Sequence, residues 1–128
     1  MGEGRRSVLV VEDDGEMRNL LRDGLWSEGY RLQEVGDGDA AVQSVLQDEP
    51  DLILTEIRLP AGGVGHVSRL RALAPSCPIV VMTAFGDEKI KGDVLRAGAT
   101  AYFNKPVHLA ELMLCVNQLL GAERSVAK

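Results

Sequence analysis

Five short apolar runs, each followed by a segment with helical spacing, constrain the fold of this chain more than any other feature. The apolar runs lie at 7–11, 30–35, 51–55, 78–82 and 101–103. Helices are predicted at 15–28, 39–48, 87–97 and 107–120, and a further helix carries Val67, Leu70 and Leu73. Strands that alternate with helices indicate a parallel sheet covered on both faces. Right-handed crossovers in a chain of 128 residues favour a doubly wound, flavodoxin-like α/β sheet of order 2-1-3-4-5.

The helical patterns also predict which side chains enter the core. The first helix shows Met17, Leu20, Leu21 and Leu25, the second Ala41, Val45 and Leu46, and the last Leu109, Leu112, Met113, Val116, Leu119 and Leu120. Gly121 is expected to end the last helix. We expect Trp26 to pack rather than bind a ligand, and 1–6 and 122–128 to be tails of one domain with a core of about 7–120.

Composition excludes several functions. A hydrophobic content of 45% supports a buried core, and a net charge of −5 argues against direct binding to nucleic acid. The apolar runs fall short of the roughly 20 residues that span a membrane. Cys77 and Cys115 share no motif spacing, and His66 and His108 have no partner at metal-ligand spacing, so none is assigned a site. A cytoplasmic protein with reduced thiols is expected.

Polar side chains gather where the predicted strands end. Glu12, Asp13 and Asp14 follow the first strand, Glu56 the third, Thr83 and Ala84 the fourth, and Asn104, Lys105 and Pro106 the fifth. Ligands bind at this edge of such sheets, beside the switch point between the first and third strands. Clustered carboxylates suit Mg²⁺, and a hydroxyl with an ammonium suits the oxygens of a phosphoryl group.

Each of these residues also has a structural interpretation. Asp13 with Glu16 fits a helix capping box. Thr83 fits a strand-end hydroxyl, and Lys105 fits a solvated lysine before Pro106. The functional interpretation rests on their occurrence together at four strand ends.

The segments "VLVVEDD", "PDLILTEIRLP", "VVMTA" and "GATAYFNKP", with Gly65 and Gly98, resemble the CheY-like receiver domain of two-component response regulators. The resemblance implies a phosphorelay signalling module rather than an enzyme, and it implies roles for individual residues. The metal site would comprise Glu12, Asp13 as the direct Mg²⁺ ligand, the position of Glu56, and the backbone carbonyl of Arg58. Thr83, Ala84 and Lys105 would surround the phosphoryl group, Tyr102 would be the aromatic switch, and the bond to Pro106 would be cis.

Glu56 stands where this family has its phospho-accepting aspartate. One extra methylene moves the carboxylate outward by about 1.5 Å, and an error of about 1 Å in the position of a nucleophile can cost about 100-fold in rate. We therefore expect the self-phosphotransfer chemistry to be lost, with weak Mg²⁺ binding. Glu56 is expected to act independently of phosphorylation or to mimic a phosphate in part, since it brings one charge against about −1.5 to −2.

The resemblance also implies partners. These are a sensor histidine kinase or phosphotransfer protein, and a second copy or an output domain docked on the face of the fourth helix, fifth strand and fifth helix. Ala110, Leu114 and Cys115 are the apolar residues expected there. Neither nucleic acid nor a membrane is expected as a direct partner, and the chain is expected to be stand-alone or part of a longer regulator.

Two alternatives remain. The segment "GDGDAA" at 36–41 matches a dinucleotide fingerprint, with Glu56 as the ribose-binding acid. Asp37 and Asp39 would repel a pyrophosphate there, and the segment follows the second strand rather than the first. The other alternative is an interaction module whose acidic pocket is vestigial.

Overall fold

The computed structural model describes residues 5–127, with side chains described as far as Gly121. Strands and helices alternate along the chain. The order is β1 (Ser7–Val11), α1 (Gly15–Ser27), β2 (Arg31–Val35), α2 (Gly38–Gln47), β3 (Leu52–Glu56), α3 (Val64–Leu73), β4 (Ile79–Thr83), α4 (Glu88–Ala97), β5 (Ala101–Asn104) and α5 (Leu109–Ala127).

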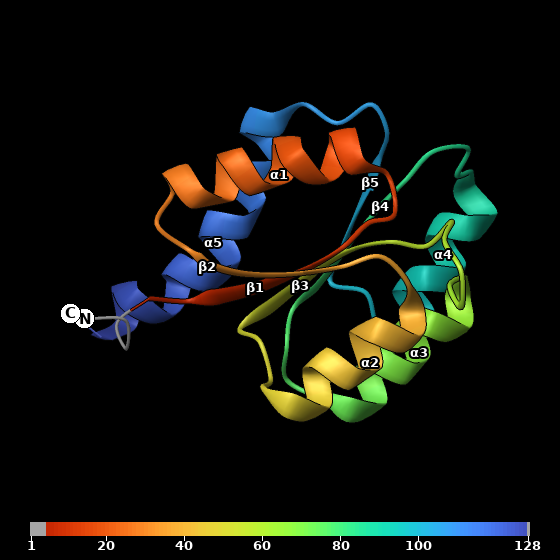
Figure 1. The fold of residues 1–128 in the computed structure, drawn as a ribbon, viewed down its shortest axis with the longest axis horizontal. Coiled ribbons are helices and arrows are strands. Elements are labelled where there is room, and N and C mark those ends of the chain that lie inside the picture. The colour runs from red at the N-terminus through yellow and green to blue at the C-terminus, as the bar shows by residue number, and fades with distance from the viewer. Residues whose placement is uncertain (1–4, 128) are drawn as a thin grey trace.

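The strands form one parallel sheet in the order β2-β1-β3-β4-β5, which confirms the predicted doubly wound topology. Helices α1 and α5 cover one face of the sheet, and α2, α3 and α4 cover the other (Figure 1). The edge strand β2 alternates exposed and half-buried side chains, as its sequence predicted. Strands β3 and β4 are buried throughout, as expected for the middle of a parallel sheet.

Alternation along the strands divides the core into two clusters. On β1, Val8 and Val10 face the α1–α5 layer, and Leu9 and Val11 face the opposite layer. The predicted stripe of α5 lies in the first of these clusters, with Leu112, Met113, Val116 and Leu120 buried and Leu109 and Leu119 packed against them. The sheet is therefore held rigidly from both sides, and its strand ends are fixed positions for a site.

Four predictions about the helices were wrong. Leu46 and Trp26 are 62% and 69% exposed, and Leu20 is also exposed, because the buried faces of their helices are already filled by neighbours such as Val45, Leu21 and Leu25. Helix α5 continues past Gly121 to Ala127 instead of ending there. A glycine inside a helix costs only about 1 kcal/mol, so it weakens a helix without stopping it.

None of the helices in the described part of the chain is long and apolar enough to cross a membrane.

Candidate functional site

The candidate site lies at the carboxyl edge of the sheet, where neighbouring strands end. Glu12 follows β1 directly, Glu56 is the last residue of β3, and Thr83 is the last residue of β4. Lys105 follows β5, one residue beyond Asn104, the partner of Thr83 in the register. The topology therefore brings together four of the predicted site residues.

Lys105 bridges the two buried carboxylates. Its Nζ lies 2.7 Å from Oε1 of Glu12 and 2.9 Å from Oε1 of Glu56. Both glutamate side chains are almost fully buried, and that of Lys105 is 17% exposed. We call Glu12, Lys105 and Glu56 the ion triad. With both glutamates ionised, it carries two negative charges against one positive charge.

The carboxylate of Glu56 turns back onto its own backbone. Oε2 accepts hydrogen bonds from the backbone N–H of Ile57, at 2.7 Å, and of Arg58, at 2.8 Å. Oε1 is the oxygen paired with Lys105. Both oxygens of Glu56 are therefore occupied by donors of the same chain, and neither is free to point into solvent.

The pKa values follow from these contacts. Burial raises the pKa of Glu56, but the Arg58 N–H and the Lys105 ammonium outweigh burial and hold this pKa below its ordinary value. Burial raises the pKa of Glu12 above its ordinary value, despite its bond to Lys105. Burial lowers the pKa of Lys105, yet the two glutamates outweigh it and leave that pKa raised. Lys105 therefore stays protonated and Glu56 ionised at neutral pH.

Helix α1 begins next to the triad. Its cap is Asp14, which accepts a hydrogen bond from the N–H of Glu16 at 3.0 Å, so the predicted capping box starting at Asp13 is wrong. The second oxygen of Glu12 accepts from the N–H of Asp14 at 3.2 Å, and the carbonyl of Glu12 accepts from Nη1 of Arg18 at 2.8 Å. Asp13 is exposed and stands outside the triad.

The triad does not form a preassembled metal site. No group of three His, Cys, Asp or Glu residues within the described range is placed to hold a metal ion. The oxygens of Glu12 and Glu56 are instead occupied by Lys105 and by backbone N–H groups. Because the ammonium of Lys105 pairs with both buried carboxylates, it would compete with a Mg²⁺ ion for Glu12 and Glu56 in this arrangement.

The remaining predicted residues surround the triad. The buried hydroxyl of Thr83 donates to the carbonyl of Ala84 at 3.1 Å, and the hydroxyl of Tyr102 donates to Oδ1 of Asn104 at 2.8 Å. A Cβ at Gly86 would lie 1.7 Å from that tyrosine oxygen, so the loop after β4 packs directly on Tyr102. The predicted cis bond before Pro106 is present.

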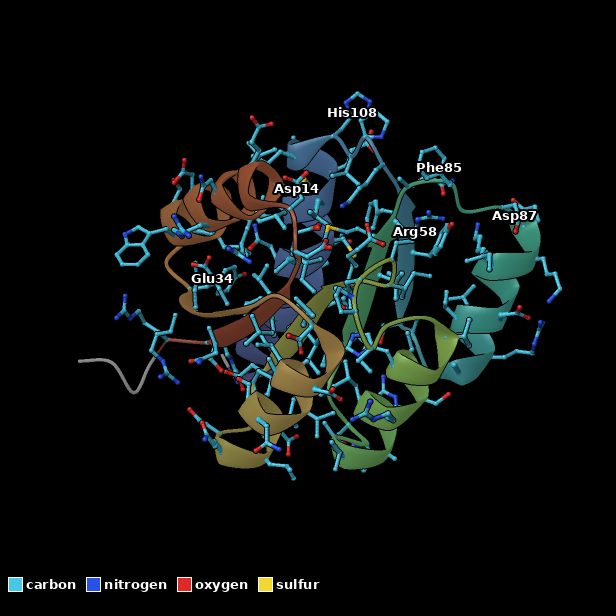
Figure 2. All side chains as sticks on the ribbon, turned by 45° about the vertical axis from the view of Figure 1, so that its right-hand side comes forward. Asp14, Glu34, Arg58, Phe85, Asp87 and His108 are labelled. Atoms are coloured by element: carbon cyan, nitrogen blue, oxygen red, sulfur yellow. The ribbon has the colours of Figure 1, made fainter. Side chains whose placement is uncertain are left out.

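Sequence reasoning missed two pairs beside the site. His66 and Thr55 are buried and in contact, Nε2 to Oγ1, at 2.9 Å. Arg58 lies over the ring of Phe85, 5.1 Å from its centre, on the loops that follow β3 and β4 (Figure 2). A signal for His66 existed, because it precedes Leu70 by one helical turn on the buried side of α3. Nothing in the sequence around Phe85 indicated its partner.

The start of α2 argues against a nucleotide site at "GDGDAA". Asp37 caps the helix by accepting from the N–H of Ala40 at 2.7 Å, so a carboxylate already occupies the position that a phosphate would take. Gly38 is required for packing, since a Cβ there would lie 1.8 Å from the carbonyl oxygen of Ala61. Gly38 therefore allows the start of α2 to lie close to the backbone at Ala61.

The apolar residues of α5 lie elsewhere than predicted. Ala110 and Leu114 line a groove between α1 and α5, together with Gly24 and Ser27. They therefore give no support to a docking face on the side of α4 and β5. Cys115 packs against the α1–α5 core cluster, and both cysteines are free thiols, as expected.

Comparisons with known proteins agree with this geometry. The family model described as "Response regulator receiver domain" matches residues 8–117. The transcriptional regulatory protein PrrA of Mycobacterium tuberculosis is 37% identical over 123 residues, which cover 94% of this chain and 52% of PrrA. ResD of Bacillus subtilis is 34% identical over 113 residues, covering 88% of this chain and 47% of ResD. The chain thus spans about half the length of these relatives.

A solved structure shows the same fold. The CheY-like receiver domain protein of Methanospirillum hungatei superposes with a TM-score of 0.87, at 24% identity, over 94% of this chain and 98% of that one. Family match, sequence relatives and topology all agree: the chain belongs to the response regulator receiver domain family.

Proposed function

We propose that this receiver domain signals without being phosphorylated, with Glu56 standing at the position of the acceptor aspartate. One observation carries the proposal: both oxygens of Glu56 are occupied, one by Lys105 and the other by two backbone N–H groups. Receiver domains are signalling modules of two-component systems. In the proposed version of that role, a fixed carboxylate replaces the transient phosphoryl group.

Two physical arguments support the loss of phosphotransfer. A carboxylate attacks phosphorus only when one oxygen is free and aligned with the leaving group. Glu56 must break its bonds to Ile57, Arg58 or Lys105 to present such an oxygen, and it then projects one methylene too far. The metal expected to organise that attack also competes with Lys105 for the same carboxylates.

The ion pair with Lys105 supports partial mimicry of the phosphorylated state. Lys105 is the residue that the family resemblance assigns to the phosphoryl group, and here it binds Oε1 of Glu56 at 2.9 Å. A carboxylate supplies one charge where a phosphate supplies about −1.5 to −2. Glu56 is therefore expected to bias the domain toward the active conformation by less than phosphorylation does.

Partner docking is proposed on the α4–β5–α5 face, for a second copy of the chain or an output domain in the cytoplasm. Support comes from Tyr102, whose hydroxyl touches the loop leading into α4 at Gly86, and from Leu95, an exposed leucine of α4. The relatives are about twice as long and are named as transcriptional regulators, which favours an attached output domain. A histidine kinase or phosphotransfer protein remains the family's upstream partner.

Intact-mass measurement after incubation with acetyl phosphate and Mg²⁺ tests the central proposal. We expect no added phosphoryl group on the parent chain. Glu56→Asp should gain one, because the shorter side chain restores the geometry of the acceptor, and Glu56→Gln should stay unmodified. A phosphoryl group mapped to Glu56 itself would overturn the proposal.

The docking face has a matched pair of variants. Leu95→Arg places a charge on α4, whereas Leu114→Arg places one in the α1–α5 groove. If the α4–β5–α5 face mediates self-association, sedimentation velocity should show a shift toward monomer for Leu95→Arg alone. A shift for Leu114→Arg alone would assign association to the groove instead.

A further inference from the structure

A buried histidine lies directly behind the strand end that carries Glu56. His66, in the first turn of α3, is 1% exposed, and its Nε2 lies 2.9 Å from Oγ1 of Thr55. Thr55 is the penultimate residue of β3 and is fully buried. The same hydroxyl oxygen lies 2.7 Å from the carbonyl oxygen of Glu56. Three groups thus form one chain of contacts, from the imidazole through the hydroxyl to the backbone of Glu56.

The direction of each hydrogen bond in this chain is fixed by proton counting. A carbonyl oxygen only accepts, so the single hydroxyl proton of Thr55 must be donated to Glu56. Thr55 then has no proton left for His66, and the contact at Nε2 requires a proton on the ring nitrogen. His66 therefore donates from Nε2.

The other ring nitrogen is consistent with this assignment. Nδ1 of His66 is buried and has no hydrogen-bond partner among the described residues. Burial, together with the nearby charge of Arg69, lowers the pKa of His66 to about 4, so the ring is neutral at neutral pH. A neutral ring with its proton on Nε2 leaves only a bare lone pair at Nδ1. The opposite tautomer would leave a buried N–H unpaired, which is the more costly arrangement.

The Glu56 carbonyl belongs to the same peptide group as the N–H of Ile57. That N–H donates to Oε2 of Glu56 at 2.7 Å, while the carbonyl accepts from Thr55 on the other side of the group. We propose that His66 is a positioning residue: its Nε2–H holds the Thr55 hydroxyl on the Glu56 carbonyl and so fixes the peptide plane whose N–H binds the Glu56 carboxylate. This role goes beyond the proposed function, because it holds whether or not Glu56 accepts a phosphoryl group.

The tautomer of His66 in the unmodified protein is the first test. A long-range ¹H–¹⁵N spectrum at neutral pH should show a protonated Nε2 and an unprotonated Nδ1. A proton on Nδ1 would overturn the proposal, since Thr55 would then have to donate to the ring and release the Glu56 carbonyl. This measurement needs no variant, so a substitution that fails to fold leaves it decisive.

Conservative substitutions separate positioning from simple core packing. The readout is the amide proton shift of Ile57, which reports its bond to the Glu56 carboxylate and is calibrated by Glu56→Gln. Thr55→Val should move this shift, whereas Thr55→Ser should leave it near the parent value, because only serine keeps the hydroxyl. His66→Met should move it, and His66→Gln, which retains an N–H donor, should move it less.

Two outcomes would contradict the role. An Ile57 shift that is unchanged in Thr55→Val and His66→Met shows that the pair fills space and positions nothing. An equal movement in the Ser and Val variants shows that the hydroxyl is irrelevant. Neither outcome bears on whether Glu56 accepts phosphate, which the mass measurement decides separately.

Discussion

Lys105 and Arg71 are both partly buried cations, yet they bind opposite kinds of partner. Lys105 lies at the carboxyl edge of the sheet between two carboxylates, Glu12 and Glu56. Arg71, near the end of α3, donates to backbone carbonyls beyond both α3 and α4. Nε and Nη2 of Arg71 donate to the carbonyl of Gly98, at 3.1 and 2.7 Å. Nη1 donates to the carbonyls of Ala74, Pro75 and Cys77, at 2.9, 3.0 and 2.7 Å.

Of these two networks, the ion triad can respond to a signal and the contacts of Arg71 cannot. The ion triad depends on charge, so protonation, a metal ion or a phosphoryl group changes its energy. The planar guanidinium of Arg71 matches fixed carbonyl directions and holds the ends of α3 and α4 to the loop that precedes β4. Its acceptors do not titrate. One end of the molecule is therefore adjustable, and the other is a structural clamp.

Among the variants, Lys105→Met should lower the free energy of unfolding the most. Removal of the ammonium leaves two buried carboxylates facing each other, and breaking a buried ion pair in this way costs about 3–5 kcal/mol. Partial access of solvent to Lys105 places the loss in the free energy of unfolding nearer 3 kcal/mol at neutral pH. Urea denaturation measures it, and Glu56→Gln in the same background should recover part of the loss.

The effect of Lys105→Met should shrink in acid. In the parent, the folded-state pKa of Glu56 is lowered, so its stabilisation is present above its ordinary pKa and is lost as pH falls through the folded value. In the variant, the carboxylates of Glu12 and Glu56 repel each other, which should raise both pKa values. Protonation of either carboxylate then removes this repulsion. The two stability curves should therefore converge as pH falls below the ordinary glutamate range. Parallel curves would contradict the charge-based account of the triad.

Arg71→Ala should cost somewhat less, about 2–3 kcal/mol, because it leaves several half-buried carbonyls without donors. Unlike the loss at Lys105, it should be the same in mildly acidic and neutral buffer. Arg71→Lys keeps the positive charge but loses the planar set of guanidinium N–H donors, so it should recover little of the lost free energy of unfolding. Arg69→Ala is the matched control, since its single exposed contact to Asp39 at 3.4 Å should contribute less than about 0.5 kcal/mol.

The smallest expected effect concerns Mg²⁺. The parent should bind it with millimolar or weaker affinity, because the ion must displace Lys105 from Glu12 and Glu56. Lys105→Met should bind Mg²⁺ more tightly, and Asp13→Ala should abolish binding. Calorimetry measures both. Binding by Asp13→Ala that equals the parent would remove Asp13 from the site.

The fold was predictable because strand and helix periods recur along the whole chain, and parallel strands with right-handed crossovers leave few topologies. The members of the triad were predictable from their places at strand ends. Their contacts were not, because a strand end does not reveal that Glu56 turns back onto the N–H groups of Ile57 and Arg58. The His66–Thr55 pair was missed since it joins two elements by a single polar contact inside an apolar face.

Phe85, described above as the partner of Arg58, has a consequence for how firmly the loop after β4 is held. Its φ of 59° lies in the left-handed region, which costs a side-chain-bearing residue about 1–2 kcal/mol, and the residue as a whole is 85% exposed. The contact with Arg58 offsets only about 0.5–1 kcal/mol of that. The contact therefore offsets only part of the backbone strain at Phe85. A ligand or partner that covers the ring, or glycine in place of Phe85, changes this local balance two residues from Thr83.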